Sequence, residues 1–298
     1  MIRFLSRSWL CKPIPIRRAG EKSMNEKILS KDMFRRYAAE FIGTFALVFF
    51  GCGARSMVGD TTDFAGILLV HLAFGLTVAA MIYTLSYISS AHFNPAITLG
   101  FAIARRFPWR FVVPFWIAQF AGALCASTIH FLILPSEKVM AAHFGATTPK
   151  IGDFQAVVLE IALTFFLMYV SMGTATDKRF NRSEGGLTVG FIIIVSGLFA
   201  NSLSGGSMNP ARSLAPAVFA GGSALASVWI YFVGPIIGAL IGALIYELIR
   251  GSEVHAKDVL EELPVKKNGV EQLKLPDTDM VKNPLCYNGH LFYARFTA

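Results

Sequence analysis

Charged residues are scarce in this chain. Asp, Glu, Lys and Arg together make up 15% of its 298 residues, whereas 54% are hydrophobic. A soluble domain carries about 25% charged residues, so this chain has too few charges to cover a water-facing surface. Its mean hydropathy of +0.54 agrees with this shortage. The composition therefore excludes an ordinary soluble domain and favours a protein embedded in a membrane.

Closely spaced cysteines and catalytic motifs are lacking as well. The four cysteines lie far apart, without the spacing of metal ligands, so we expect neither a disulfide framework nor a cysteine metal site. The sequence also has no nucleotide-binding glycine loop, no metal-ligating cluster and no recognisable pair of nucleophile and base. We therefore expect no enzyme activity, no cofactor and no metal ion.

Positive charge is concentrated at the N-terminus. Residues 1–36 contain ten Lys or Arg against three acidic residues. A basic segment beside the first apolar run is typical of a cytoplasmic flank rather than of a nucleic-acid surface. Basic residues recur at 105–110 and 178–182 and are sparse in the alternate loops. We expect both termini in the cytoplasm, as a basic tail over 1–35 and a disordered tail over 250–298, and no nucleic-acid partner.

Long apolar runs recur along the chain. A helix needs about 20 apolar residues to cross the bilayer core. Six stretches reach that length, at roughly 36–57, 64–88, 111–134, 154–175, 186–204 and 224–249. Two further apolar stretches, 92–104 and 207–219, are too short to cross, and each predicts a re-entrant half-helix enclosed by protein. The predicted fold class is an all-α membrane protein with six transmembrane helices and two re-entrant half-helices.

The two halves of the chain resemble each other, because each contains one Asn-Pro-Ala tripeptide. The tripeptide residues are Asn94, Pro95, Ala96, Asn209, Pro210 and Ala211. The predicted repeats, 36–134 and 154–249, each contain three spans, so the second copy enters the membrane inverted. The channel domain therefore covers residues 36–249 and has its shared site near the middle of the bilayer.

The tripeptide predicts the start of a helix. Asn is a favourable N-cap, and Pro suits the first helical position. Each helix N-terminus carries about half an elementary positive charge, so two facing N-termini would repel cations and protons. The amides of Asn94 and Asn209 could donate hydrogen bonds to a neutral solute. The carbonyls of residues 90–93 and 205–208 could accept them.

With these motifs the chain resembles the aquaporins of the major intrinsic protein family, from about residue 34 to residue 249. The segments HFNPA (92–96) and NPAR (209–212) carry the resemblance. It implies a passive channel for water and another small neutral solute, with membrane lipid around it. It also implies a homotetramer of multi-pass subunits, which we expect in the plasma membrane or the cell inner membrane.

The resemblance further implies a selectivity filter at Phe74, Gly197, Gly206 and Arg212. Typical water-only relatives have histidine where Gly197 stands. Two glycines leave two walls without side chains, so we expect a filter that is wider and less polar than a strict water filter. The alternative function is therefore a facilitator mainly for ammonia, hydrogen peroxide or glycerol-like solutes.

Several polar residues in apolar surroundings allow more than one interpretation. Buried carboxylates often mark transport, but the symmetric placement of Glu40 and Glu160 favours acceptors that hold the re-entrant loops. We expect His92 to brace the first loop, with gating by protonation as the alternative. The span histidines His71 and His130 are expected to be polar residues of the bundle without a ligand.

Two other kinds of transport protein fit the sequence less well than a channel does. A secondary active transporter can also use inverted repeats and broken helices. It would need an acidic residue at the substrate site for ion coupling, and the Asn-Pro-Ala junction offers only amides and dipoles. An ion channel is disfavoured because the helix ends and Arg212 are positive.

Overall fold

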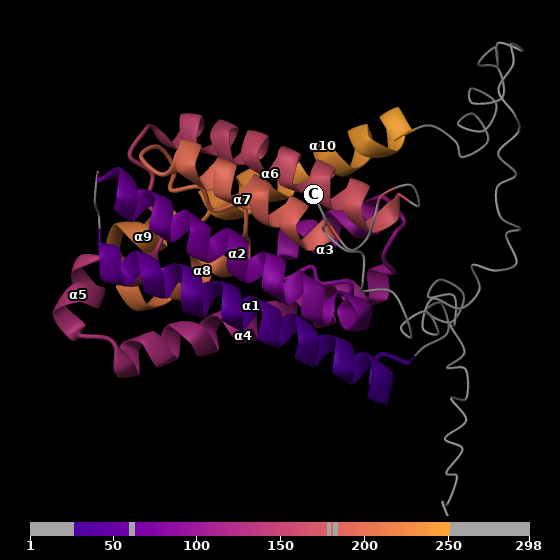
Figure 1. Ribbon diagram of the computed structural model, residues 1–298, viewed down its shortest axis with the longest axis horizontal. Coiled ribbons are helices and arrows are strands. Elements are labelled where there is room, and N and C mark those ends of the chain that lie inside the picture. Colours follow the sequence, from indigo (N-terminus) through magenta and orange to yellow (C-terminus); the bar gives the residue numbers. More distant parts are fainter. Residues whose placement is uncertain (1–26, 60–62, 178–179, 181–183, 251–298) are drawn as a thin grey trace, which may run out of the picture. The chain divides into compact units, whose positions relative to one another are not determined.

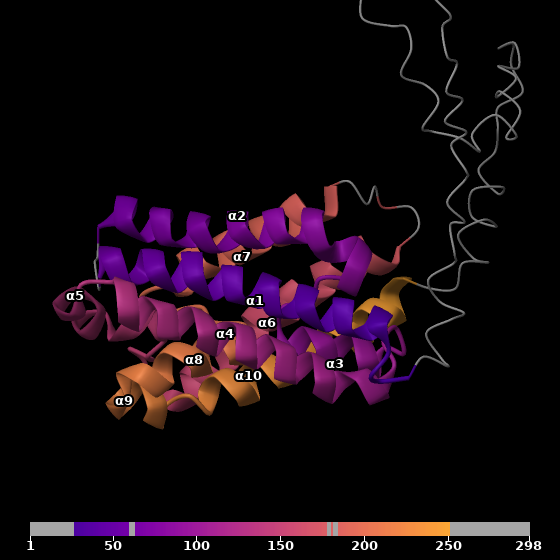
Figure 2. The ribbon, with the colours of Figure 1, turned by 90° about the horizontal axis from the view of Figure 1, so that it is seen from below.

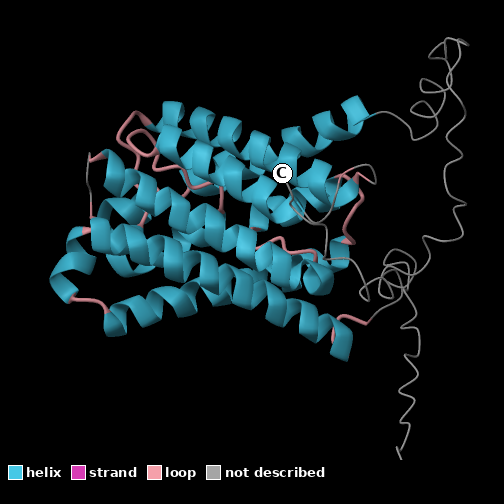
Figure 3. Cartoon of the chain, viewed as in Figure 1, coloured by secondary structure: helices cyan, strands magenta, loops and turns pink. Residues whose placement is uncertain are grey.

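The computed structural model describes residues 27–59, 63–177, 180 and 184–250. Within these residues all regular structure is helical, as the cartoon shows (Figure 3). Most of the two predicted tails lies outside the described residues. The first long helix already begins at Lys31, and Arg250 still belongs to the last one, so the predicted boundaries at 35 and 250 are corrected by a few residues.

The helices divide between the two predicted halves. The first half contains α1 (Lys31–Val58), α2 (Phe64–Ser89), α3 (Pro95–Ile103), η2 (Trp109–Phe111) and α4 (Val112–Ile133). The second contains α6 (Asp153–Thr176), α7 (Gly185–Ala200), α8 (Pro210–Ala220), α9 (Gly222–Ala226) and α10 (Ile230–Arg250). The connection between them holds α5 (Ser136–Ala141) and η3 (His143–Gly145).

The predicted spans are found, with corrections to their ends. Among the described residues, five helical segments are long and apolar enough to cross a membrane, while α7 has only 16 residues. The chain leaves α7 at Ala200 rather than at 204, because the N–H groups of Leu203, Ser204 and Gly205 all bond back to the Ala200 carbonyl. The last span begins at Ile230 rather than at 224, since α9 and a turn precede it.

Helix packing follows the repeat. In the first half α1 packs against α2 and α4, and in the second α6 packs against α7 and α10. The contact between α2 and α7 joins the halves, and each half-helix packs against the third long helix of the other half, α3 on α10 and α8 on α4. The chain starts α1 and finishes α10 at one end of the bundle, here called the tail end (Figure 1). The opposite end carries α5 and α9.

The two half-helices enter from opposite ends. In Figure 2, α3 lies near the tail end and α8 lies toward α5 and α9. The predicted helix starts are confirmed: Asn94 caps α3 by accepting the N–H of Ala96, and Asn209 caps α8 by accepting that of Ala211. A proline follows each cap. Both half-helices begin three residues later than the predicted stretches, because the residues before each asparagine form a non-helical loop.

Glycines let the long helices approach closely. A Cβ atom on Gly122 of α4 would lie 2.3 Å from the carbonyl oxygen of Phe41 in α1. In the second half, a Cβ on Gly238 of α10 would lie 2.3 Å from the carbonyl oxygen of Ile161 in α6. Backbone contacts of this kind accept only glycine, as is common between membrane helices.

This packing predicts the effect of a single methyl group. Gly122→Ala should destabilise the protein by about 1 to 3 kcal/mol, because the new methyl overpacks the contact with α1. Gly173→Ala is the matched control, since its Cβ would meet Tyr246 at an ordinary 3.5 Å. The melting midpoint of the purified protein in detergent should fall for the first variant only. Equal midpoints would show that the helices can separate without cost.

Candidate functional site

The tips of the two half-helices are bonded to each other. The side-chain Nδ2 of Asn94 donates to the Met208 carbonyl at 2.7 Å, and Nδ2 of Asn209 donates to the Phe93 carbonyl at 2.9 Å. Each asparagine also accepts from the backbone of its own helix through Oδ1. An amide group has two N–H hydrogens, so one on each side chain remains for a solute.

A buried glutamate holds the first loop. Glu40, with no exposed surface, accepts the backbone N–H of His92 at 3.0 Å and of Phe93 at 2.7 Å. It also accepts from the Ser89 hydroxyl at 2.6 Å and from Gln119 Nε2 at 2.7 Å. Both carboxyl oxygens accept a backbone N–H, a pattern that a carboxylate satisfies. Helix α1 thereby fixes the segment that leads into α3.

Glu160 repeats this arrangement in the second half. It is also fully buried and accepts the backbone N–H of Ser207 at 2.9 Å and of Met208 at 2.8 Å. The Ser204 hydroxyl donates to it at 2.7 Å, as Ser89 does to Glu40. Bonds from backbone to both glutamates are the arrangement that the symmetric placement of the pair led us to expect.

Both loops contain backbone that is otherwise unfavourable. Positive φ angles occur at Ser90 (75°), Ala91 (54°), Phe93 (50°), Gly205 (88°), Gly206 (61°) and Met208 (56°). The three positive-φ positions of the first loop correspond one by one to those of the second, always at the same separation in sequence. The two loops therefore share this backbone pattern. A left-handed non-glycine residue costs about 1 to 3 kcal/mol. The bonds to the buried carboxyl groups offset that cost.

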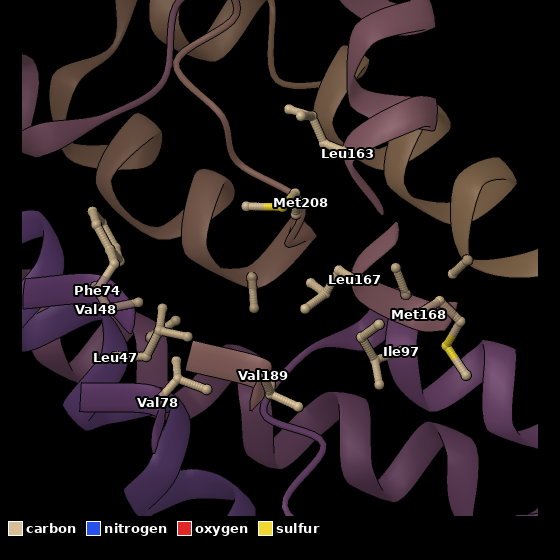
Figure 4. Packing of buried hydrophobic residues seen from close by; sticks show 14 of the residues in the cluster. Leu47, Val48, Phe74, Val78, Ile97, Leu163, Leu167, Met168, Val189 and Met208 are labelled. Carbon is tan, nitrogen blue, oxygen red and sulfur yellow. The ribbon is translucent and has the colours of Figure 1, made fainter. Parts of the chain in front are cut away.

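A cavity of about 420 Å³ passes the half-helix tips. It extends from Arg36 and Tyr87 at the tail end, past both asparagines, to Arg212. The loop residues before each asparagine line it, and apolar side chains form much of the remaining wall. The lining includes Leu47 and Val78 of the first half and Leu167 and Val189 of the second, which Figure 4 labels among the buried hydrophobic side chains. The cavity thus combines apolar walls with polar groups, among them those of the half-helix tips.

Arg212 lies at the far end of this cavity. Its side chain is buried, and Nη1 donates to the Gly145 carbonyl at 3.1 Å. Its Cζ atom lies 4.7 Å from the centre of the Phe74 ring, a distance typical of a cation–π contact. Phe74, Gly206 and Arg212, three of the four residues expected in the filter, line the cavity together.

The prediction that Gly197 leaves one wall of the filter without a side chain is wrong. The imidazole of His71 fills this place, because a Cβ atom on Gly197 would lie 2.1 Å from His71 Nδ1. His71, rather than Gly197, lines the cavity. Sequence reasoning treated His71 as an ordinary polar residue of the bundle, since nothing in its spacing connects it with a glycine in another helix.

His92 lies in an aromatic cluster beside the first half-helix. Its ring stacks on Phe101 at 4.8 Å between centroids and contacts Phe107 and Phe115 at 4.9 and 5.4 Å. Nδ1 is 3.1 Å from the Thr98 hydroxyl, and His92 lines the cavity. The residue is therefore part of the packing that supports α3.

Other residues of the site were missed from the sequence. Ser89 and Ser204 are separated by the same offset as the two asparagines, a signal that could have identified them. Gln119, which also donates to Thr98 at 2.9 Å, had no such signal. Within the described residues no group of three or more His, Cys, Asp or Glu could hold a metal ion.

Two inverted halves whose half-helices meet at one cavity define a membrane channel fold. Residues 27–246 match the family described as Major intrinsic protein. Aquaporin NIP2-2 from Zea mays is 43% identical over 222 residues, covering 74% of this chain and 74% of that protein. Aquaporin NIP1-1 from Oryza sativa subsp. japonica is 44% identical over 226 residues, covering 74% and 76%.

The fold is also shared with a solved structure. The X-ray structure of the aquaglyceroporin from Plasmodium falciparum matches with a TM-score of 0.66 and 24% identity, over 73% of this chain and 96% of that one. The chain belongs to the major intrinsic protein family, whose members are membrane channels and not enzymes.

The glutamate bonds generate a prediction. Glu160→Gln should lower the stability by about 1 to 3 kcal/mol, because the amide turns an N–H donor toward a buried backbone donor. Glu40→Gln should behave alike. Glu137→Gln, at an exposed residue of α5, is the control. Melting midpoints in detergent check this, and a Glu160→Gln protein as stable as the control would contradict the supporting role of the carboxylate.

Proposed function

We propose that this chain forms a passive channel for water and other small neutral solutes and excludes protons and ions. One observation carries the proposal: the oppositely inserted α3 and α8 meet through reciprocal bonds of Asn94 and Asn209, and both asparagines line a single cavity. The aquaporins among the similar proteins support it.

The helix ends supply the ion barrier. Each contributes about half a positive charge to the cavity, which opposes the entry of a cation. A water molecule can replace hydrogen bonds to other water molecules with hydrogen bonds from the remaining amide hydrogens of Asn94 and Asn209. Loop carbonyls provide acceptors on either side. Neutral molecules therefore pass the point that repels cations.

Arg212 acts as the filter arginine in this proposal. Its bond to the Gly145 carbonyl and its position over Phe74 hold the guanidinium at one end of the cavity. There it donates hydrogen bonds to the solute and adds a full positive charge. With Phe74 and Gly206 it forms the selectivity filter, and Glu40, Glu160 and His92 hold the loops that build the path.

We further propose that the tail end faces the cytoplasm, in the plasma membrane or the cell inner membrane. Arg106, in the basic segment after α3, forms an ion pair of 2.8 Å with Glu247 near the end of α10. The basic connection thus lies at the same end as the start of α1 and the finish of α10. An excess of Lys and Arg on the cytoplasmic side is the usual pattern.

A homotetramer, with one pore in each subunit, completes the proposal. It rests on the resemblance to aquaporins. Large apolar side chains such as Phe50 and Leu76 are exposed on the surface of the bundle, where they contact lipid or neighbouring subunits. Native mass spectrometry of the detergent-solubilised protein would give four chains per particle if the proposal holds.

Blocking the cavity tests the channel. Val189 of α7 lines it, whereas Val195 of the same helix is 61% exposed on the outer surface. In proteoliposomes studied by stopped-flow light scattering, the wild type should shrink faster than protein-free vesicles, without dependence on sodium or proton gradients. Val189→Trp should reduce water flux toward the background, and Val195→Trp should not. Equal flux in the two variants would contradict a path through this cavity.

Removing the filter charge tests ion exclusion. Arg212→Ala should increase proton entry, because a full charge is lost from a confined, poorly hydrated site. The measurement is the acidification of vesicles that contain a pH-sensitive dye, driven by a membrane potential. Arg110→Ala, at an exposed residue of η2, is the control. A proton leak that is unchanged in Arg212→Ala would assign the barrier to the helix ends alone.

A further inference from the structure

His71 occupies the wall that Gly197 leaves open. Its ring atoms Nδ1, Cε1 and Cγ lie 2.1, 2.7 and 2.7 Å from the place of a Cβ on Gly197. A side chain from α2 therefore fills the space where α7 has none. Gly206 also lies against this glycine, since a Cβ on Gly206 would be 3.2 Å from Gly197 Cα.

A hydrogen bond fixes the orientation of the ring. His71 Nε2 lies 3.1 Å from Asn201 Oδ1, and this oxygen also accepts from Arg55 Nη1 at 2.7 Å. The Arg55 guanidinium can only donate hydrogen bonds, so the Asn201 atom that faces it must be the amide oxygen and not the amide nitrogen. An amide oxygen can only accept, so Nε2 of His71 carries the hydrogen. In the neutral ring Nδ1 is then the acceptor, and it lies on the side of Gly197.

His71 lines two neighbouring cavities. A second cavity of about 10 Å³ is lined by Arg55, Lys150 and Asn201, among others. Within the described residues, His71 and Arg212 are the two that line both cavities. The small cavity has the size of one water molecule. The imidazole and the guanidinium therefore separate the two spaces.

We infer that His71 determines the solute selectivity of this channel by narrowing the constriction from α2 in place of a side chain at position 197. An imidazole acceptor and a guanidinium donor give a single water molecule two hydrogen bonds as it passes. A molecule as wide as glycerol is excluded by the ring. The inference rests on the proposed channel function and favours water over the glycerol-like solutes of the alternative.

Removing the ring should widen the filter. In proteoliposomes that contain the full chain, the wild type should conduct water and exclude glycerol. His71→Ala should raise the ratio of glycerol to water permeability by about tenfold or more, the scale on which a pocket discriminates by size. His130→Ala is the matched control, because His130 is buried in α4, bonds to the Phe49 carbonyl at 2.8 Å and is not among the residues lining either cavity.

Moving the ring to the other helix tests the geometry itself. Gly197→His alone should destabilise the protein, because its Cβ collides with His71. Combined with His71→Ala, it should be tolerated and should restore the exclusion of glycerol. If His71→Ala does not fold, His71→Asn keeps a donor for Asn201 with a smaller side chain, and it should admit glycerol in the same way.

The possible outcomes distinguish failure of the proposed channel function from failure of the inference about His71. A wild-type protein that passes no water overturns the proposed function and this inference with it. A wild type that conducts water, with the same glycerol ratio in His71→Ala or His71→Asn as in His130→Ala, overturns the inference alone. A wild type that already conducts glycerol freely also overturns it, and supports the wider facilitator.

Discussion

The structure depends on two buried carboxyl groups that hold unfavourable backbone in place. Glu40 and Glu160 each accept two consecutive backbone N–H groups of a loop with left-handed residues. Without these bonds the loops would have unsatisfied donors deep in the bundle, where each costs about 1 to 3 kcal/mol. The positions of Asn94 and Asn209 follow from the loops. The proposed path for solutes in turn follows from the asparagines.

The site divides into a rigid centre and a constriction whose composition can vary. At the centre, each loop is bonded to a buried glutamate and to the asparagine of the opposite half, which fixes the geometry. At the constriction, His71 and Phe74 of α2 and Arg212 of α8 meet through side-chain packing. Size selection can therefore change by substitution at one of these positions without altering the centre.

Much of the fold could be predicted because its signals are local. Asn followed by Pro at the start of an apolar segment favours a helix start, and the spacing of apolar runs indicates the spans. The two Asn-Pro-Ala segments gave the inversion, since each half has three spans. The end of α7 was missed because the turn after Ala200 contains no proline or glycine until Gly205.

The filter could not be predicted from the same signals. Whether His71 reaches Gly197 depends on how α2 and α7 are rotated against each other, and apolar periodicity does not determine this rotation to within one side chain. Gln119 reaches Glu40 across α4 and α1 for the same reason. Contacts between side chains of different helices thus could not be predicted from the sequence pattern, whereas contacts within a motif could.

The cross-bonds between the halves have an evolutionary consequence. Asn94 is bonded to the loop of the second half and Asn209 to that of the first, so inserting or deleting a residue in either loop would displace the amide of the other. The duplicated halves are therefore free to diverge in side chains but not in loop length. Length changes should accumulate instead in the connection that holds α5, whose described residues neither amide contacts.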